Sequence, residues 1–93
     1  MNNYELTVVL PGEVTSAKKK SVIQKVEKLV KDSGGNIKKS DEWGKIDLAY
    51  KIKKEKAGIF LHYNLEIDGS DAKNLKDKLR LDGDIIRYLL IRA

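Results

Sequence analysis

The stretch from Gly35 to Ile67 constrains the fold of this chain more than any other, because apolar side chains recur there at every second position. That period is typical of a half-buried strand. In the second half the apolar positions are Ile59, Leu61, Tyr63, Leu65 and Ile67, and the positions between them are Phe60, His62, Asn64 and Glu66. In the first half Ile46, Leu48, Tyr50 and Ile52 share a face. The charged segment 53–58 separates the two runs, so the sequence predicts a long antiparallel hairpin with a basic tip.

A strand and a helix precede this hairpin. Residues 3–10 alternate between apolar and polar side chains, and the Pro-Gly pair that follows stops the strand. Thr15 or Ser16 can cap the next helix, and Gly34, with Gly35 as a second option, can end it. The apolar stripe of this helix consists of Val22, Ile23, Val26, Leu29 and Val30.

A second helix and a last strand follow the hairpin. Asp68 or Ser70 is the candidate cap of the helix, and Asp71 complements the helix dipole. The apolar positions of this helix are Ala72, Leu75 and Leu79. An Asp-Gly-Asp turn ends it, and residues 85–91 alternate as a strand. One face of that strand carries Ile86, Tyr88 and Leu90, and the other carries Arg87, Leu89 and Ile91.

The predicted order of elements is β-α-β-β-α-β, within a single domain of residues 1–93. Crossover connections are right-handed in nearly all proteins, so both helices are expected on the same face of one sheet. The sequence therefore predicts an α+β, ferredoxin-like split βαβ fold with a four-stranded antiparallel sheet in the order 4-1-3-2. In that fold the other sheet face has no helix on it. The strand over residues 35–52 lies at an edge, where its unpaired backbone groups could accept an added strand.

The net charge of +5 is unevenly distributed. Residues 18–56 carry thirteen lysines against six acidic residues, so the excess belongs to the first helix, the first hairpin arm and the hairpin tip. Such asymmetry suggests a polyanion as partner, although a solvated lysine face is a common cause of lysine runs.

Nothing in the sequence indicates catalysis. His62 is the single histidine and there is no cysteine, so we expect no catalytic residue, no metal site, no cofactor and no small-molecule substrate. The chain has no run of apolar residues long enough to span a membrane, and its start lacks the basic residues of a signal peptide, so we expect a cytoplasmic protein.

The sheet face without helices is the best candidate for binding. Phe60 and His62 are expected on it, next to Arg87, Leu89 and Ile91, and an apolar surface of this kind usually contacts a partner. Trp43 precedes Gly44, where a bulge could re-aim the indole ring. We expect that ring to cover the edge of the core rather than to stack on a nucleobase.

The chain resembles the family of bacterial small-subunit ribosomal protein S-six. The resemblance is carried by Asp41-Glu42-Trp43-Gly44-Lys45 followed by Leu48-Ala49-Tyr50 and Ile52, and its most specific part is the Glu-Trp-Gly and Leu-Ala-Tyr pair at this spacing. Four further segments also fit: Tyr4-Glu5, Gly58–Glu66, Leu79–Asp82 and Ile85–Arg87. The family has the ferredoxin-like fold predicted above. This chain departs from the family pattern at Ile46 and Asp47, where basic residues are usual, and at Lys51, where proline is usual. All three departures lie on the predicted edge strand.

The resemblance implies a non-catalytic role in the small ribosomal subunit, where the protein binds ribosomal RNA as a pair with ribosomal protein S-eighteen. We expect the isolated protein to be a monomer. We expect RNA contacts from Tyr4, Arg80, Arg87 and Arg92, and in second rank from Lys53, Lys54 and Lys56. We expect the protein partner to contact Asp41, Glu42, Trp43, Lys45 and Asp47. The alternatives are a self-associating regulatory domain and a stand-alone RNA-binding module.

Overall fold

The structure is a computed structural model that describes the backbone of residues 2–52 and 55–93 and the side chains of residues 2–45 and 57–93. Its elements are β1 (Asn2–Pro11), α1 (Ser16–Asp32), β2 (Asn36–Ile52), β3 (Glu55–Ile67), α2 (Gly69–Leu81) and β4 (Arg87–Arg92). The predicted β-α-β-β-α-β order is confirmed.

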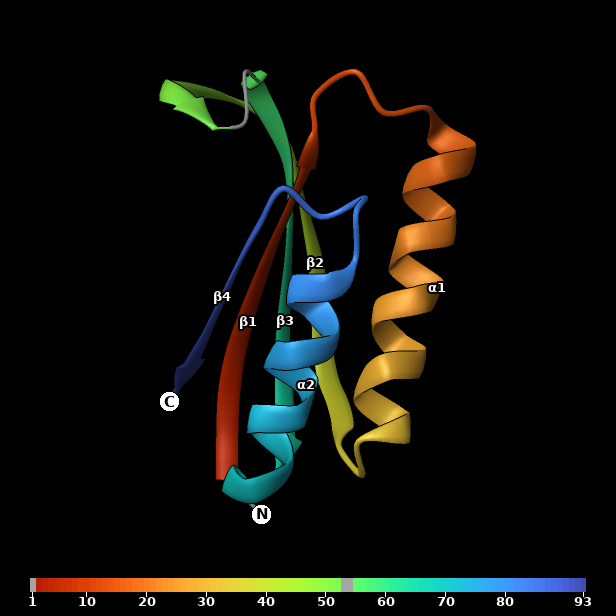
Figure 1. The fold of residues 1–93 in the computed structure, drawn as a ribbon, viewed down its shortest axis with the longest axis vertical. Coiled ribbons are helices and arrows are strands. Elements are labelled where there is room, and N and C mark those ends of the chain that lie inside the picture. The colour runs from red at the N-terminus through yellow and green to blue at the C-terminus, as the bar shows by residue number, and fades with distance from the viewer. Residues whose placement is uncertain (1, 53–54) are drawn as a thin grey trace.

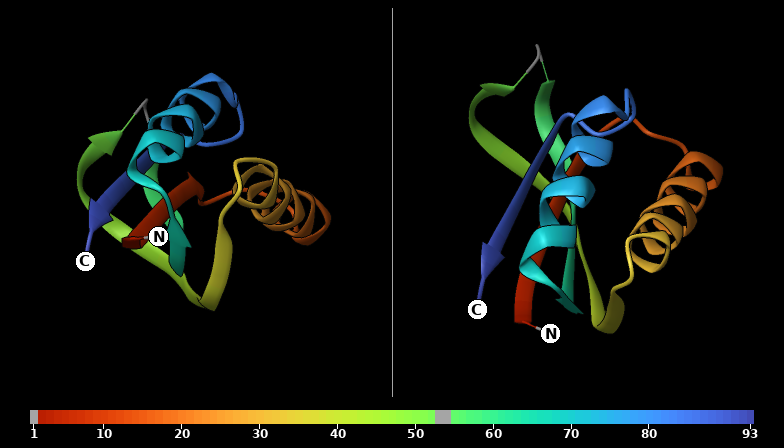
Figure 2. Two further views of the ribbon diagram at one scale, coloured as in Figure 1. Left: turned by 90° about the horizontal axis from the view of Figure 1, so that it is seen from below. Right: turned by 60° about the horizontal axis from the view of Figure 1, so that its bottom comes forward.

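The four strands form one antiparallel sheet in the order β2-β3-β1-β4. This is the predicted order 4-1-3-2, and the fold is the predicted ferredoxin-like split βαβ fold. Both helices pack on the same face of the sheet, and β2 and β4 form its two edges (Figures 1 and 2). The opposite face, called here the open face, has no helix over it among the described residues.

Local interactions fix the two ends of α1. Thr15 is the N-cap, and its hydroxyl accepts a hydrogen bond of 3.1 Å from the backbone N–H of Lys18. At the other end Gly34 has a φ of +83°. Its backbone N–H bonds to the carbonyl of Lys31, and the N–H of the next glycine bonds to the carbonyl of Val30. Two such bonds make a Schellman motif, in which glycine is favoured because its φ is positive. Of the two alternatives at each end, the structure therefore selects Thr15 and Gly34.

The core lies between the helices and the sheet and consists of side chains from all six elements or the turns beside them. Its fully buried members include Leu6, Leu10, Leu61, Leu65, Ile67, Val22, Val26, Val30, Leu75 and Leu79. Each buried aliphatic side chain of this size contributes about 1.5–3 kcal/mol relative to an exposed one. The alternation in the sequence had placed all of these residues on core-facing stripes, so the position of the core was predictable.

Two strand boundaries differ from the prediction. The strand expected over residues 85–91 begins at Arg87, because an Asx turn, in which the side chain of Asp82 accepts the N–H of Asp84 at 2.9 Å, keeps the chain turning. Ile85 is instead buried at the end of the core. The third strand begins at Glu55 rather than at Ile59, so the hairpin arms extend into the segment predicted as its tip.

Candidate RNA and protein interfaces

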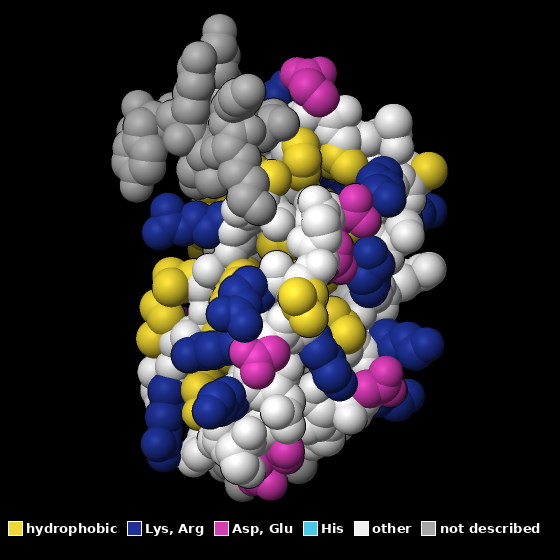
Figure 3. Space-filling view, in the orientation of Figure 1, with side chains coloured by type: hydrophobic (Ala, Val, Ile, Leu, Met, Phe, Trp, Pro, Cys, Tyr) yellow, Lys and Arg dark blue, Asp and Glu magenta, His cyan; other side chains and the backbone are white. Residues whose placement is uncertain are grey.

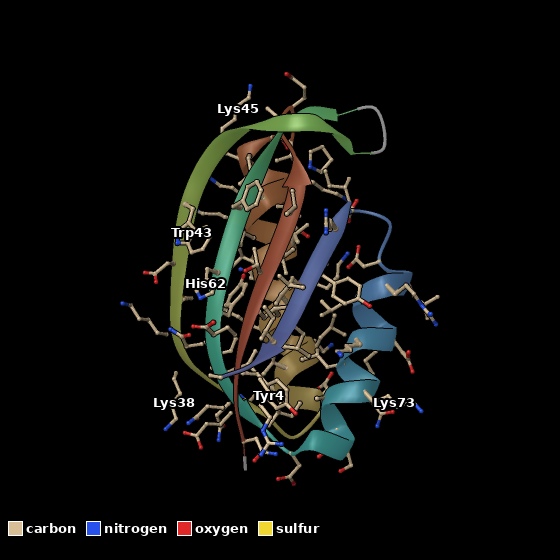
Figure 4. All side chains as sticks on the ribbon, turned by 90° about the vertical axis from the view of Figure 1, so that its left-hand side faces the viewer. Tyr4, Lys38, Trp43, Lys45, His62 and Lys73 are labelled. Carbon is tan, nitrogen blue, oxygen red and sulfur yellow. The ribbon has the colours of Figure 1, made fainter. Side chains whose placement is uncertain are left out.

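The open face carries an exposed apolar and aromatic surface. Its largest exposed groups are Trp43, Leu89 and Ile91, with 52%, 50% and 49% of their surface accessible. Phe60 and His62 of β3 lie half-buried between the neighbouring strands, as the alternation predicted. Figure 4 looks onto this face and shows the four strands side by side, with α1 behind them and α2 beside β4. Exposed apolar surface concentrated on one face is typical of an interaction site.

A bulge in β2 directs Trp43 onto the open face. The pairing of β2 with β3 shifts between Glu42 and Gly44, and Gly44 has a φ of +79°, which glycine adopts without strain. The indole of Trp43 stacks on the imidazole of His62, with ring centroids 4.8 Å apart and planes 11° from parallel (Figure 4). The expectation that Trp43 covers the edge of the core is therefore wrong, since the bulge turns its ring to the other side of the sheet.

The Trp43–His62 pair is held in place from the next strand. Thr7 of β1 lies directly opposite His62, and its hydroxyl oxygen is 3.1 Å from Nδ1 of the imidazole. This hydrogen bond fixes the plane on which the indole stacks. Ring pairs of this kind are worth about 0.5–1.5 kcal/mol beyond the area that they bury. The open face thus presents a tryptophan whose orientation is set before any partner arrives. Sequence reasoning did not single out Thr7, although the alternation of β1 had placed it on this face.

The predicted RNA-binding residues lie in two separate groups at opposite ends of β4. Tyr4 and Arg92 are direct neighbours across the β1–β4 pairing, and Arg92 donates a hydrogen bond of 3.0 Å to the side chain of Asn2. Tyr4 is half-buried beside the start of α2, where its hydroxyl is 3.6 Å from the position of a Cβ on Gly69. This end of the sheet is labelled in Figure 4 by Tyr4, with Lys38 and Lys73 on either side.

Arg80 and Arg87 form the second group. They line an open groove of about 370 Å³ between the end of α2 and the start of β4, together with Leu79, Ile85, Ile86 and Tyr88. Arg80 also lies 3.7 Å from Asp77 in an exposed ion pair. Because a strand rises about 3.4 Å per residue, Arg87 lies roughly 17 Å along β4 from Arg92. The four first-rank candidates thus lie in two groups, Tyr4 with Arg92 and Arg80 with Arg87. Lys53, Lys54 and the side chain of Lys56 lie outside the described residues.

The predicted partner edge is divided between the two sides of β2. Glu42 forms an ion pair with Lys19 of α1, and Lys45 lies 3.7 Å from Glu13, so both side chains extend toward the helix side. Asp41 lies opposite His62 in the pairing with β3, next to Trp43 on the open face. The side chain of Asp47 lies outside the described residues. Trp43 and Asp41 thus belong to the open face, whereas Glu42 and Lys45 secure β2 to the rest of the fold.

A charged cluster holds α1 against the turn between α2 and β4. Lys25 lies 3.1 Å from Asp82 and 3.2 Å from Asp84, and Lys18 lies 3.1 Å from Asp84. The hydrogen bonds from Lys18 and Lys25 lower the pKa of Asp84 below its ordinary value, and those to Asp82 and Asp84 raise the pKa of Lys25. This cluster is structural, because each charge in it is satisfied by an opposite one.

The described residues contain no candidate metal site, and one buried tyrosine has a shifted pKa. No group of three or more His, Cys, Asp and Glu that could hold a metal occurs within residues 2–45 and 57–93. The phenol of Tyr63 is buried in the core, and that burial raises its pKa to about 12, so it stays neutral. Among the helices described here, none is long and apolar enough to cross a membrane.

A helix-backed ferredoxin-like sheet with an exposed aromatic face and basic groups at its ends has the surface features typical of a binding domain. Comparison with known proteins identifies its family. The family model described as Ribosomal protein S6, the family named S-six above, matches residues 3–92. The chain belongs to the ribosomal protein S6 family, as the resemblance predicted.

Relatives and a solved structure agree with this assignment. The small ribosomal subunit protein bS6 of Pelagibacter ubique is 33% identical over 93 residues, covering 100% of this chain and 77% of that protein. The bS6 protein of Carboxydothermus hydrogenoformans is 32% identical, covering 99% of this chain and 96% of its own. The crystal structure of 30S ribosomal protein S6 from Thermotoga maritima superposes with a TM-score of 0.93 at 25% identity, covering 99% of this chain and 87% of that one.

Proposed function

We propose that the protein is a structural constituent of the small ribosomal subunit that binds small-subunit ribosomal RNA together with ribosomal protein S-eighteen. Membership of the S6 family supports the ribosomal part of this proposal, because the relatives described above are named small ribosomal subunit proteins. The observation that carries the rest is the separation of two kinds of surface, one apolar and aromatic and the other basic.

The open face suits a protein partner. Protein interfaces have apolar cores in which tryptophan is over-represented among the residues that dominate affinity. Trp43, Leu89 and Ile91 supply such a core, and the stack on His62 keeps Trp43 in one orientation. This pre-organisation favours binding, because less side-chain entropy is lost when the partner docks. We assign the open face to S-eighteen.

The two ends of β4 suit RNA. Arginine contacts phosphates through a planar fork of donors, and tyrosine can stack on a base while it donates through its hydroxyl. Arg92 with Tyr4 lies at one end of β4 on the helix side of the sheet, where Tyr4 packs against the core, and Arg87 with Arg80 lies at the other end. An RNA that contacts both ends would run along β4, which is an edge of the sheet, beside a partner seated on the open face.

A filter-binding titration with small-subunit ribosomal RNA fragments, with and without S-eighteen, tests this function. We expect tight binding only with S-eighteen, weakening as salt increases. Arg92→Ala should weaken the complex and lower its salt slope by about 1, whereas Lys76→Ala on the exposed side of α2 serves as the matched control. Absence of RNA binding in both conditions would contradict the proposal.

A second titration separates the protein partner from the RNA. Trp43→Ala should weaken the association with S-eighteen by about 2 kcal/mol, as expected for a central tryptophan. Leu81→Ala is the control, since Leu81 is 81% exposed but belongs to α2 on the other side of the sheet. The isolated protein should sediment as a monomer; a dimer that Trp43→Ala disrupts would instead assign the open face to a second copy of this chain.

A further inference from the structure

The six lysines of α1 divide into two sets with different surroundings. Lys18, Lys19 and Lys25 are ion-paired with acidic groups of β2 or of the turn after α2. Lys20, Lys28 and Lys31 are exposed and form no ion pair with the described residues. The first set connects α1 to neighbouring parts of the fold, whereas the second set has no such structural role.

The unpaired lysines share one side of the helix. At 3.6 residues per turn, Lys20, Lys28 and Lys31 fall within an arc of about 80°, with Gln24 between them. This arc lies opposite the buried stripe of Val22, Val26 and Val30, so it points away from the sheet. With a rise of 1.5 Å per residue, the stripe is roughly 16 Å long. Figure 3 shows basic side chains following the right-hand side of the molecule, where α1 runs in Figure 1.

We propose that this lysine stripe, formed by Lys20, Lys28 and Lys31, is a second polyanion-binding surface that takes the phosphate backbone of RNA. It is distinct from the two ends of β4 and from the open face, because α1 covers the opposite side of the sheet. The inference rests on the proposed function, since that function makes RNA the polyanion that the protein meets. A row of exposed lysines roughly 16 Å long can span several phosphates of a nucleic-acid strand, which recur about every 3.4 Å along the axis of a duplex.

The chemistry of the surrounding surface favours RNA over the other anionic partners. A protein partner requires an apolar interface core, and none of the exposed large apolar side chains of the described residues belongs to α1. A membrane surface requires a helix whose apolar face is free to insert, whereas the apolar face of α1 is buried in the core. Contacts to phosphates need exposed cations, and the stripe offers three of them, which outnumber the two exposed acidic residues beside it, Glu27 and Asp32.

The second helix provides a matched control. Lys73, Lys76 and Lys78 of α2 are exposed and unpaired as well, within the part of the chain that the structure describes. Their directions around the helix spread over about 200°, so they form no stripe. Replacing either set by glutamine removes three positive charges from an exposed helix surface. Only the replacement on α1 removes lysines that are aligned in one stripe.

The test measures binding of the free protein to a short RNA duplex of arbitrary sequence at several salt concentrations. The triple variant Lys20→Gln, Lys28→Gln, Lys31→Gln should lower the slope of log affinity against log salt by about 2 to 3, because each phosphate contact contributes ~0.9. The triple variant Lys73→Gln, Lys76→Gln, Lys78→Gln should lower it by less than about 1. Equal changes of this slope in both variants would mean that only net charge matters, and this would overturn the inference. An unchanged slope in the α1 triple variant would overturn it as well.

Two further measurements identify the ligand and separate this inference from the proposed function. Equal losses of the α1 triple variant on RNA and on phosphatidylserine vesicles would overturn the assignment to RNA. The same variant is then titrated with ribosomal RNA fragments and S-eighteen. If wild-type protein fails to bind there, the proposed function fails while the duplex measurement still decides the lysine stripe. If partner-dependent binding persists but the duplex slopes do not differ, the stripe alone is refuted.

Discussion

Replacing Gly44 by alanine isolates the backbone conformation that directs Trp43 onto the open face. Gly44 has a φ of +79°, and a Cβ added there would meet no atom within 4 Å, so the substitution introduces strain without a clash. Gly83 is equally open but does not have a positive φ, and Gly83→Ala is therefore the matched control. Each change removes a similar amount of backbone entropy from the unfolded chain, worth about 0.4–1 kcal/mol.

The difference between the two variants is the cost of the left-handed conformation for an L-residue, about 1–2 kcal/mol. Gly83→Ala should be slightly more stable than wild type, and Gly44→Ala should have the lower free energy of unfolding of the two. For a domain of this size each kcal/mol corresponds to about 4–8 °C in Tm. Urea denaturation followed by circular dichroism gives the free energies, and the fluorescence of Trp43, the single tryptophan, reports on the bulge. Equal stabilities would refute the assignment of strain to Gly44.

Three other experiments probe the core, the charged cluster and the aromatic pair. Leu75→Ala removes a side chain with no exposed surface and should cost about 2–5 kcal/mol of unfolding free energy, whereas Leu81→Ala should change it by less than about 0.5 kcal/mol; similar losses would contradict the assigned core. Because the pKa of Asp84 is lowered in the folded state, its contribution to stability is present above about pH 4 and is lost as the pH falls through the lowered value. Asp84→Asn should therefore flatten the acid limb of a plot of stability against pH, and Asp77→Asn, which breaks an exposed pair, should leave it unchanged. A double-mutant cycle of Trp43→Ala and His62→Ala, read by urea denaturation, should give a coupling energy of about 0.5–1.5 kcal/mol; a value of zero would mean that the stack does not form in solution.

Periodicity was enough to predict the core, and together with the right-handed crossover rule it predicted the topology. Alternation along β1 and β3 and the stripes of both helices depend on local spacing, and burial follows that spacing directly, as at Leu61 and Val26. The wrong start predicted for the last strand, at residue 85, also comes from relying on local spacing. The alternating pattern continues from Ile85, but a side-chain hydrogen bond of Asp82 turns the backbone there, and alternation does not detect such a bond.

The candidate interfaces were less predictable because they depend on contacts between distant residues. Gly44 signalled a bulge, but the side to which it turns Trp43 is set by pairing with Phe60 and Leu61 on β3. Glu42 was predicted as a partner residue because it is charged and lies on an edge strand. Its ion pair with Lys19, 23 residues away, becomes visible only once α1 is packed on the sheet.

The arrangement of the surfaces would allow so small a sheet to bind both of the proposed ligands at once. A four-stranded sheet backed by helices has two broad faces, and in this chain the helix side exposes lysines while the open side exposes aromatic and apolar groups. Arg87 and Arg92 lie at the two ends of β4, which is an edge strand between the two faces. From this edge their side chains are within reach of a ligand on either face. Docking of a protein on the open face would leave both the β4 ends and the outward face of α1 accessible. RNA could then contact the ends and α1 without displacing the protein partner, so the two ligands need not compete.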